Sequence, residues 1–223
     1  MNLLEKFNIV PKDRHLYDVA FTHGSYRTKH GLDYTYERLE FLGDSVLNMI
    51  VSEYLYKQYP DYEEGKLTKL RANYVCQTAL IYYSHELGLD KHIKIYGDDS
   101  KITENEVLSI TADVFESFLG AIFLDQGIEF AKDYISKIIF PYIDAKKVFF
   151  FDYKSVIKEY GDAQEVDIEY KIIDECGVSH NKTFIISILI DGKEMGVGKG
   201  KNKKEAEQAA SKQAMKKLKI QKY

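Results

Sequence analysis

The stretch "YERLEFLGDSVL", residues 36–47, combines the apolar spacing of a packed helix with three carboxylates. Glu37, Glu40 and Asp44 are separated by three and four residues, so they share one helix face. Like charges at this spacing repel by about 0.2–0.5 kcal/mol in an exposed helix. Gly43 adds a helix cost of about 1 kcal/mol relative to Ala. The stretch fits either a solvated acidic stripe or a metal or acid–base site, and this helix alone leaves both open.

A second acidic pair lies in "ITADVFESFLGAIFLD", residues 110–125, where Asp113 and Glu116 are three residues apart on an otherwise apolar helix. If the two helices pack side by side, these acids meet Glu40 and Asp44. Four carboxylates share a pocket in ionised form only when a cation neutralises them. Oxygen ligands without His or Cys favour Mg²⁺ or Mn²⁺, and such a site suits phosphodiester hydrolysis.

The first 145 residues are rich in helical periodicity. Apolar residues recur at three- and four-residue spacing through 37–59, 67–87 and 107–139, which predicts long helices there. Loops are expected at 58–66 and 96–106, where polar residues, Pro or Gly interrupt the pattern. This part of the chain is therefore predicted to be all-α.

The pattern changes near residues 145–152, where three consecutive phenylalanines are more typical of a strand or a docking contact than of a flexible linker. Beyond them the sequence predicts five elements in the order α-β-β-β-α. These are a helix over 152–162, a strand over 166–177, two strands within 181–200 joined at Asp191-Gly192, and a helix over 202–220.

Charge is distributed unevenly along the 223 residues, although the net charge is only −4. Residues 193–223 hold ten lysines against three acids, a net charge of +7, whereas residues 1–149 carry −6. An acidic body with a basic end indicates cation chemistry in the first part and polyanion binding in the second.

Composition excludes several classes of protein. Hydrophobic residues make up 45% and charged residues 30% of the chain, which is ordinary globular composition. No run of 18 apolar residues occurs, so no membrane span is expected, and the N-terminus has no signal-peptide pattern. Cys76 and Cys176 lack ligand spacing and are expected to be free thiols, which favours a cytoplasmic location.

The motifs together resemble the ribonuclease III family of double-strand-specific endoribonucleases. "ERLEFLGDS" (37–45) is similar to the family signature, "TADVFESFLGAIFLD" (111–125) to its second acidic motif, and "FTHGSY" (21–26) to its early helix motif. The C-terminal 70 residues resemble a double-stranded RNA-binding domain. The resemblance implies an all-α endonuclease domain of the ribonuclease III fold over 1–147. A small α+β domain of the double-stranded RNA-binding fold, α-β-β-β-α, is expected over 151–221.

The resemblance also implies roles for individual acids. Its four catalytic positions correspond to Glu40, Asp44, Asp113 and Glu116. Direct metal ligands would be Glu40, Asp113 and Glu116, with Mg²⁺ expected and Mn²⁺ able to replace it. Asp44 would act beside the metal, on the attacking water or the leaving oxygen. Further acids near the substrate groove would be Glu37 and Glu64.

The family resemblance implies a homodimer in which each subunit cuts one strand of an RNA duplex. Products would carry 5′-phosphates, 3′-hydroxyls and two-nucleotide 3′ overhangs, and the expected roles are in rRNA and mRNA processing. Phe41 matches the family's dimer-contact aromatic, with an ordinary core residue as the alternative. Tyr36 departs from the Asn usual in bacterial members, which is expected to affect local structure more than chemistry. His23 is expected to be structural.

Three elements of the C-terminal part are expected to hold duplex RNA, which proteins recognise through shape, 2′-hydroxyls and phosphates. Lys158 and Glu159 would face one minor groove, although most bacterial members have Gln at the position of Lys158. His180, in the loop "GVSHN", would enter the next minor groove. Phosphates would be gripped at the N-terminus of the last helix by Lys201, Lys203 and Lys204.

Two alternatives to this endonuclease belong to other classes. A catalytically inactive double-stranded RNA-binding protein of the same fold would be expected to lose acids of the quartet, and all four are present. An all-α metal phosphohydrolase acting on nucleotides should show His–Asp pairs at ligand spacing, and it would leave the basic end unexplained. The sequence therefore favours a metal-dependent endoribonuclease.

Overall fold

The computed structural model describes residues 3–97, 103–177 and 182–220. The chain divides into two compact units, one ending at Phe150 and the other beginning at Phe151. The amide oxygen Oδ1 of Asn73 accepts hydrogen bonds from the backbone N–H groups of Phe149 and Phe150, at 2.9 and 3.0 Å. The first unit therefore extends three residues beyond the domain end expected at residue 147.

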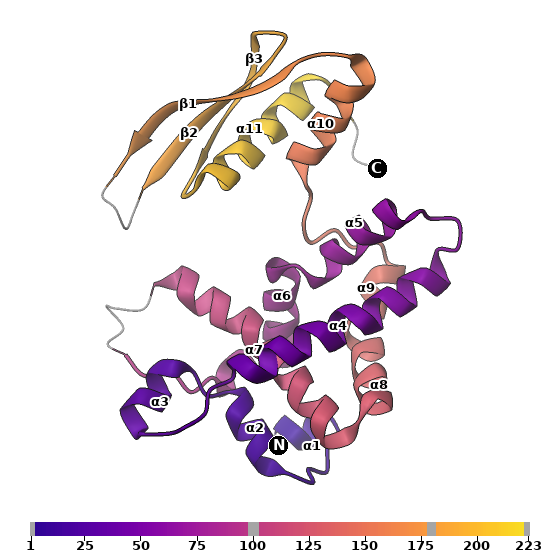
Figure 1. Cartoon of the computed structure of the whole chain (residues 1–223), viewed down its shortest axis with the longest axis vertical. Coiled ribbons are helices and arrows are strands. Elements are labelled where there is room, and N and C mark those ends of the chain that lie inside the picture. The colour runs from indigo at the N-terminus through magenta and orange to yellow at the C-terminus, as the bar shows by residue number, and fades with distance from the viewer. Residues whose placement is uncertain (1–2, 98–102, 178–181, 221–223) are drawn as a thin grey trace. The chain divides into compact units, whose positions relative to one another are not determined.

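Across its described residues the first unit contains helices joined by loops, and one isolated bridge between Thr22 and Lys94 (Figure 1). Its central helix is α7 (Glu104–Gln126), whose apolar side chains form the core of the unit. Its main packing partners are α2 (Arg14–Ala20), α4 (Glu37–Gln58), α6 (Gln77–Leu87) and α8 (Ile128–Ile138). The remaining helices of the unit are α1 (Leu3–Lys6), α3 (Gly24–His30), α5 (Glu64–Val75), the 3₁₀ helix η1 (Asp90–His92) and α9 (Phe140–Asp144).

Two of the expected long helices are each broken in two. The segment 67–87 divides at Cys76, whose backbone is extended (φ −72°, ψ 157°), into α5 and α6. The segment 107–139 divides at Gly127, whose φ of 89° favours glycine, into α7 and α8. The apolar periodicity continues across each break because a single residue interrupts the hydrogen-bond ladder without ending the apolar pattern.

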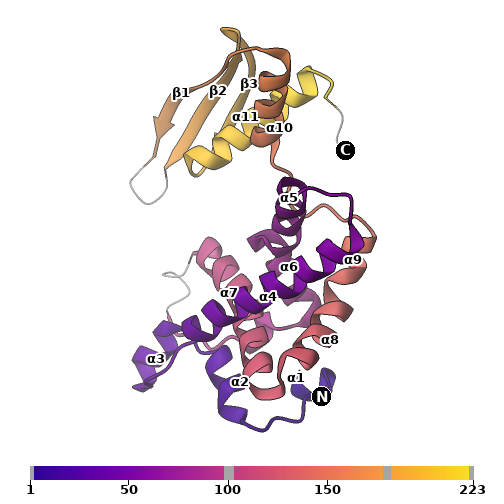
Figure 2. The ribbon, with the colours of Figure 1, turned by 45° about the vertical axis from the view of Figure 1, so that its right-hand side comes forward.

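Helices α4 and α7 cross with their backbones in close contact (Figure 2). A Cβ atom added to Gly43 would lie 1.8 Å from the carbonyl oxygen of Glu116. A Cβ added to Gly120 would lie 2.3 Å from the carbonyl oxygen of Leu39. Any side chain at these two positions would force the helices apart, so the glycine in the signature is there for packing.

Helix α7 is long and apolar enough, by length and composition, to cross a membrane. In the structure it is instead the core helix of the first unit, with its residues buried against α2, α4, α6 and α8.

The N-terminus of α7 is a capping box, in which Thr103 Oγ1 accepts from the N–H of Glu106 and the Glu106 carboxylate accepts from the N–H of Thr103.

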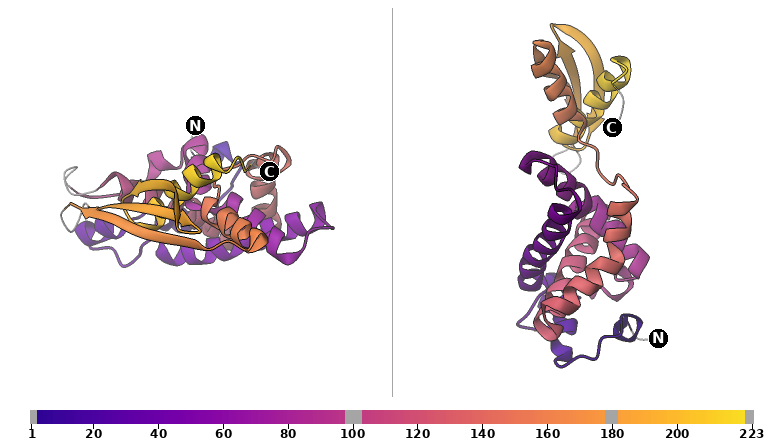
Figure 3. Two further views of the ribbon diagram at one scale, coloured as in Figure 1. Left: turned by 90° about the horizontal axis from the view of Figure 1, so that it is seen from above. Right: turned by 90° about the vertical axis from the view of Figure 1, so that its right-hand side faces the viewer.

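The second unit confirms the expected α-β-β-β-α order. Its elements are α10 (Tyr153–Gln164), β1 (Ile168–Cys176), β2 (Thr183–Ile190), β3 (Lys193–Gly200) and α11 (Lys203–Lys217). The strands form an antiparallel sheet in the order β1-β2-β3, and its twist is visible in Figure 3. Asp191 and Gly192 form the expected two-residue turn, with positive φ angles of 49° and 74°.

The two helices of the second unit share one core with the sheet. Ile157 of α10, Ile188 of β2 and Ala210 of α11 are fully buried in that cluster. Helix α11 lies directly on β3, because a Cβ added to Gly198 would be 2.0 Å from the carbonyl oxygen of Ala206. The glycines of β3 therefore allow the close approach of the helix.

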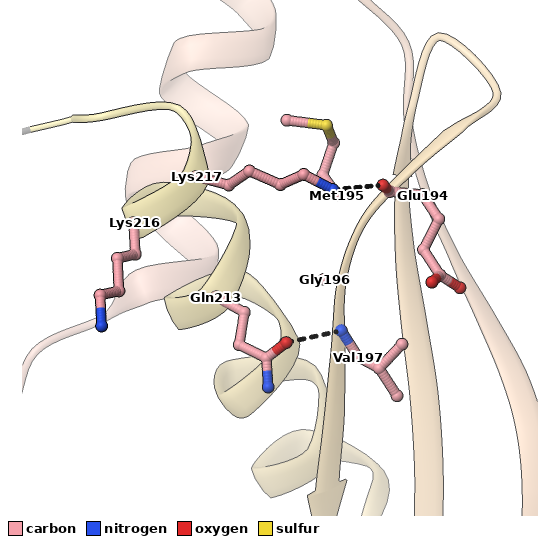
Figure 4. Close-up of a pocket in the computed structure, with 7 residues that line it drawn as sticks. All are labelled: Glu194, Met195, Gly196, Val197, Gln213, Lys216 and Lys217. Carbon is pink, nitrogen blue, oxygen red and sulfur yellow. Dashed lines mark hydrogen bonds between the residues drawn. The ribbon is translucent and has the colours of Figure 1, made fainter.

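Side chains of α11 also cover the outer edge of β3, beside a cavity of about 400 Å³ (Figure 4). Gln213 Oε1 accepts from the N–H of Val197 at 3.2 Å. Lys217 Nζ donates to the carbonyl oxygen of Glu194 at 3.1 Å. These contacts satisfy backbone groups that an edge strand would otherwise offer to another chain. The cavity is therefore a feature of edge protection and contains none of the predicted catalytic acids.

Candidate active site

The crossing of α4 and α7 brings the four predicted catalytic acids to one place. Glu40 and Asp44 lie on either side of Gly43, and the backbone atom nearest to that glycine belongs to Glu116. Glu116 is largely buried, and burial raises the pKa of its carboxyl to about 8, aided by the negative charges of Asp44, Glu40 and Asp113. The helix contact thus creates a cluster in which the four carboxylates act on one another.

Glu40 shows the same behaviour from the α4 side. Burial, aided by the negative charges of Asp113, Glu37 and Asp44, raises the pKa of its carboxyl to about 7. Glu37 is itself exposed at the first turn of α4, so it adds negative potential to the cluster from its rim. Glu64, the other additional acid, lies exposed at the start of α5 and accepts a hydrogen bond from Thr68.

The two aspartates have hydrogen-bond donors beside them. Burial raises the pKa of the Asp113 carboxyl, whereas a hydrogen bond of 3.0 Å from the Tyr36 hydroxyl to Oδ2 opposes that rise. Asp44 is exposed, and its Oδ1 accepts from Asn48 Nδ2 at 2.7 Å. Asn48 was missed from the sequence, although its position one turn after Asp44 on the same face could have signalled it.

This donor set fits a divalent cation. The ligands are carboxylate oxygens, and two of the carboxyl groups hold their charge poorly because they are buried beside like charges. A cation would relieve that repulsion. Across residues 3–97, 103–177 and 182–220 no three His, Cys, Asp or Glu side chains converge closely enough to form a coordination shell. The four acids therefore give this part of the first unit a high negative potential, and Glu40, Asp113 and Glu116 would close around an ion when it binds.

Phe41 is 78% exposed on α4, so the alternative that it is an ordinary core residue is wrong. Met49 and Tyr56, which are 48% and 73% exposed, follow it at spacings that keep all three on one face of the helix. This apolar face, Phe41–Met49–Tyr56, adjoins the acids on the same helix.

His23 caps α3 through its Nδ1, which accepts from the N–H of Ser25, and so has a structural role.

The predicted RNA contacts of the second unit are exposed where the structure describes them. Lys158 and Glu159 lie on the solvent side of α10. At the N-terminus of α11 the exposed lysines are Lys201, Lys203 and Lys204. Asn202 caps that helix by accepting from the N–H of Glu205, so phosphate contacts there would come mainly from lysine side chains. His180 lies outside the described residues.

Comparison with known proteins divides the chain in the same way. The family model described as Ribonuclease-III-like matches residues 13–143. The model described as double-stranded RNA binding motif matches residues 153–218. The two matches fall within the two compact units and leave only a short connecting stretch and the chain ends outside them.

Whole-chain relatives and solved structures are also similar to this chain. Ribonuclease 3 of Latilactobacillus sakei is 44% identical over 209 residues, covering 92% of this chain and 90% of the relative. Ribonuclease 3 of Lactiplantibacillus plantarum is 42% identical over 221 residues, covering 97% and 95%. The nuclease domain of ribonuclease III from Campylobacter jejuni superimposes with a TM-score of 0.56 at 36% identity, covering 61% of this chain and 93% of that domain.

Proposed function

The chain belongs to the ribonuclease III family and is an endonuclease of double-stranded RNA, and we propose that its four-carboxylate cluster cuts the duplex with Mg²⁺ bound. Mn²⁺ is proposed to substitute for Mg²⁺, since both accept hard oxygen ligands. The observation that carries the proposal is the meeting of Glu40, Asp44, Asp113 and Glu116 where α4 crosses α7. The inactive alternative finds no support, because all four acids are present and together.

Glu40, Asp113 and Glu116 would hold the cation, which supplies a nucleophilic water at neutral pH and neutralises charge on the phosphate. Asp44, oriented by Asn48, would accept a proton from the attacking water or stand beside the leaving oxygen. The partial burial of Glu116 would strengthen the charge interactions between the acids and a bound cation. Without neutralisation, the same acids would repel an RNA backbone.

Duplex RNA would be held by the second unit, through the exposed lysines at the start of α11 and the exposed pair Lys158 and Glu159 on α10. His180 is proposed to enter a minor groove. This division of labour is supported by the charge of the chain, +7 over residues 193–223 and −6 over residues 1–149. We place the enzyme in the cytoplasm, in rRNA and mRNA processing, as the family membership suggests.

A homodimer is proposed to form through the Phe41–Met49–Tyr56 face, so that each protomer cuts one strand. The exposure of three large apolar side chains on one helix face supports this. A region involved in dimer formation is also described for the nuclease domain from Campylobacter jejuni. Sedimentation of the full chain should show a dimer at micromolar concentration, and a monomer of 25.8 kDa would contradict it. Phe41→Ser should dissociate the dimer, whereas Val10→Ser, at an equally exposed apolar residue, should not.

Product analysis tests the proposed chemistry. A long RNA duplex cut by the full chain should give fragments with 5′-phosphates, 3′-hydroxyls and two-nucleotide 3′ overhangs, and only with Mg²⁺ or Mn²⁺ present. Ligation of the products and sequencing of both ends measure this. Products with 5′-hydroxyls, or blunt ends, would contradict the proposal that a metal-activated water attacks each strand in a paired site.

A further inference from the structure

Tyr36 stands at the N-cap position of α4 but does not cap that helix. Its side chain is only 5% exposed and makes no hydrogen bond to the first turn. Helix N-caps are normally Asn, Asp, Ser or Thr, whose short side chains accept from the first backbone N–H groups. The phenol is too long for that task, and its hydroxyl instead reaches across to α7, where it donates to Asp113 Oδ2 at 3.0 Å.

The backbone of Tyr36 is held on both sides. Its carbonyl oxygen accepts from the N–H of Glu40 at 2.9 Å, and its N–H donates to the carbonyl oxygen of Thr22 at 3.0 Å. Thr22 is fully buried, and the ring of His23 lies 5.9 Å from the Tyr36 ring. Tyr36 is therefore fixed at the start of α4 by main-chain hydrogen bonds, with its side chain in contact with the predicted metal ligand Asp113.

We infer that Tyr36 is a positioning residue that orients Asp113 for the cation, an inference that rests on the proposed metal dependence. An ionised carboxylate has two oxygens that only accept. The hydrogen bond from the phenol occupies one acceptor site of Oδ2, so it favours one orientation of the carboxylate and leaves Oδ1 as the freer oxygen for an ion. Groups that hold a metal ligand in this way raise metal affinity by removing the cost of orienting it.

This inference changes the role expected for Tyr36 from the sequence. Its position outside the acidic quartet suggested an effect on local structure more than on chemistry. The structure places Tyr36 at the start of α4 and joins its hydroxyl to the carboxylate of Asp113 on α7. The competing explanation is that the hydroxyl only stabilises the contact between the two helices. An experiment must distinguish this structural role from an effect on metal binding.

The chain offers a matched control in Tyr17. Its side chain is also 5% exposed, and its hydroxyl donates to Asp125 Oδ2 at 2.8 Å across two helices of the same unit. Asp125 is not part of the acidic quartet. Tyr17→Phe therefore removes a buried tyrosine–aspartate hydrogen bond of the same kind, without removing any group beside the proposed metal ligands.

The test measures Mn²⁺ affinity of the full chain by electron paramagnetic resonance, without RNA, for wild type, Tyr36→Phe and Tyr17→Phe. Tyr36→Phe should weaken Mn²⁺ binding about tenfold, whereas Tyr17→Phe should change it less than twofold. Thermal unfolding in EDTA should show comparable losses of stability for both variants. In cleavage assays the defect of Tyr36→Phe should shrink as Mg²⁺ is raised to saturation.

Equal Mn²⁺ affinity in wild type and Tyr36→Phe would overturn the inference, as would an equal loss in Tyr17→Phe, which would reveal a general structural effect. Absence of Mn²⁺ binding by wild type would instead refute the proposed metal dependence. A double-mutant cycle gives a second check. In an Asp113→Asn background, Tyr36→Phe should weaken Mn²⁺ binding no further, and a full additional loss would contradict positioning through Asp113.

Discussion

The contact between α4 and α7 and the contact between β3 and α11 use the same packing device for opposite purposes. In the first, a Cβ at Gly43 would lie 1.8 Å from a backbone oxygen of α7, and in the second, a Cβ at Gly198 would lie 2.0 Å from one of α11. The helix contact concentrates four acids, whereas the strand contact supports a helix whose N-terminus carries exposed lysines. Close backbone approach holds each charged surface in place. The negative surface at α4 and α7 suits a cation, and the positive surface at the start of α11 suits the phosphates of RNA.

The largest effect is expected from Glu116→Gln. The change keeps the size of the side chain but removes the charge that the cluster needs for a cation, so cleavage should fall by about a thousandfold or more. RNA binding should persist, because the second unit is untouched. A cleavage assay and a gel shift on one duplex measure the two quantities. Glu104→Gln, in the exposed first turn of the same helix, is the control and should cleave normally.

Gly43→Ala tests the packing half of the comparison. The new methyl would collide with the carbonyl of Glu116, so the first unit should lose about 3 kcal/mol of stability. Gly198→Ala should destabilise the second unit in the same way. Gly65→Ala is the matched control, because nothing lies within 4 Å of a Cβ there and α5 should gain about 0.5–1 kcal/mol. Chemical denaturation measures all three, and a neutral Gly43→Ala would show that the helices do not meet through this residue.

Asp125 is a buried carboxylate of the first unit whose environment contrasts with the acidic cluster. Burial alone would raise the pKa of its carboxyl, but donors outweigh burial and lower it: Gln126, the Tyr17 hydroxyl and the N–H groups of Lys12 and Asp13. A lowered pKa in the folded state means that this stabilisation is present above the unfolded value of about 3.9 and is lost as pH falls through the folded value.

Asp125→Asn should therefore cost about 1–3 kcal/mol at neutral pH. The difference from wild type should narrow as the pH is lowered below about 4, because Asp125 of the unfolded chain is protonated there while the folded carboxylate is protonated only at lower pH. Urea denaturation between pH 7 and pH 3 measures both quantities. A difference that stays constant across this range would show that the ionised form of Asp125 contributes nothing to stability.

The smallest effect is expected from Lys203→Ala combined with Lys204→Ala, which removes two positive charges from the N-terminus of α11 and should weaken RNA binding. Each phosphate contact removed should flatten the dependence of log affinity on log salt by about 0.9, so the slope should fall by about one to two. Lys216→Ala, near the other end of α11, removes a similar charge and should change the slope less. Equal slopes for the double variant and wild type would place the RNA elsewhere.

Much of the fold could be predicted because its signals are local. The Asp191-Gly192 turn and the alternation on either side specify the hairpin, and the acid spacing specifies the faces of α4 and α7. The breaks at Cys76 and Gly127 could not, since each depends on one residue's backbone within an uninterrupted apolar pattern. The start of α7 is also predictable, because Thr103 and Glu106 match the S/T-x-x-E pattern of a capping box.

The acids of the site could be predicted and their supporting groups could not. Glu40, Asp44, Asp113 and Glu116 follow from spacing and from the family motifs, whereas the partners Tyr36 and Asn48 bond through tertiary or one-turn contacts that carry no motif. From the sequence, Gly43 only lowers the stability of its helix. Its packing role depends on the carbonyl of Glu116 beside it, which is a tertiary contact. Catalytic acids are easier to predict from sequence patterns than residues that allow close packing, such as Gly43, or that orient an acid, such as Tyr36 and Asn48.

The central claim is that the acidic cluster cuts duplex RNA through a bound cation. It is tested most directly by incubating the full chain with a long perfect RNA duplex and with single-stranded RNA of the same sequence, each in Mg²⁺ and in EDTA. The account predicts cleavage of the duplex in Mg²⁺, with little cleavage of the single strand and none of either RNA in EDTA. Cleavage of the duplex in EDTA, or equal cleavage of the single strand, would contradict it.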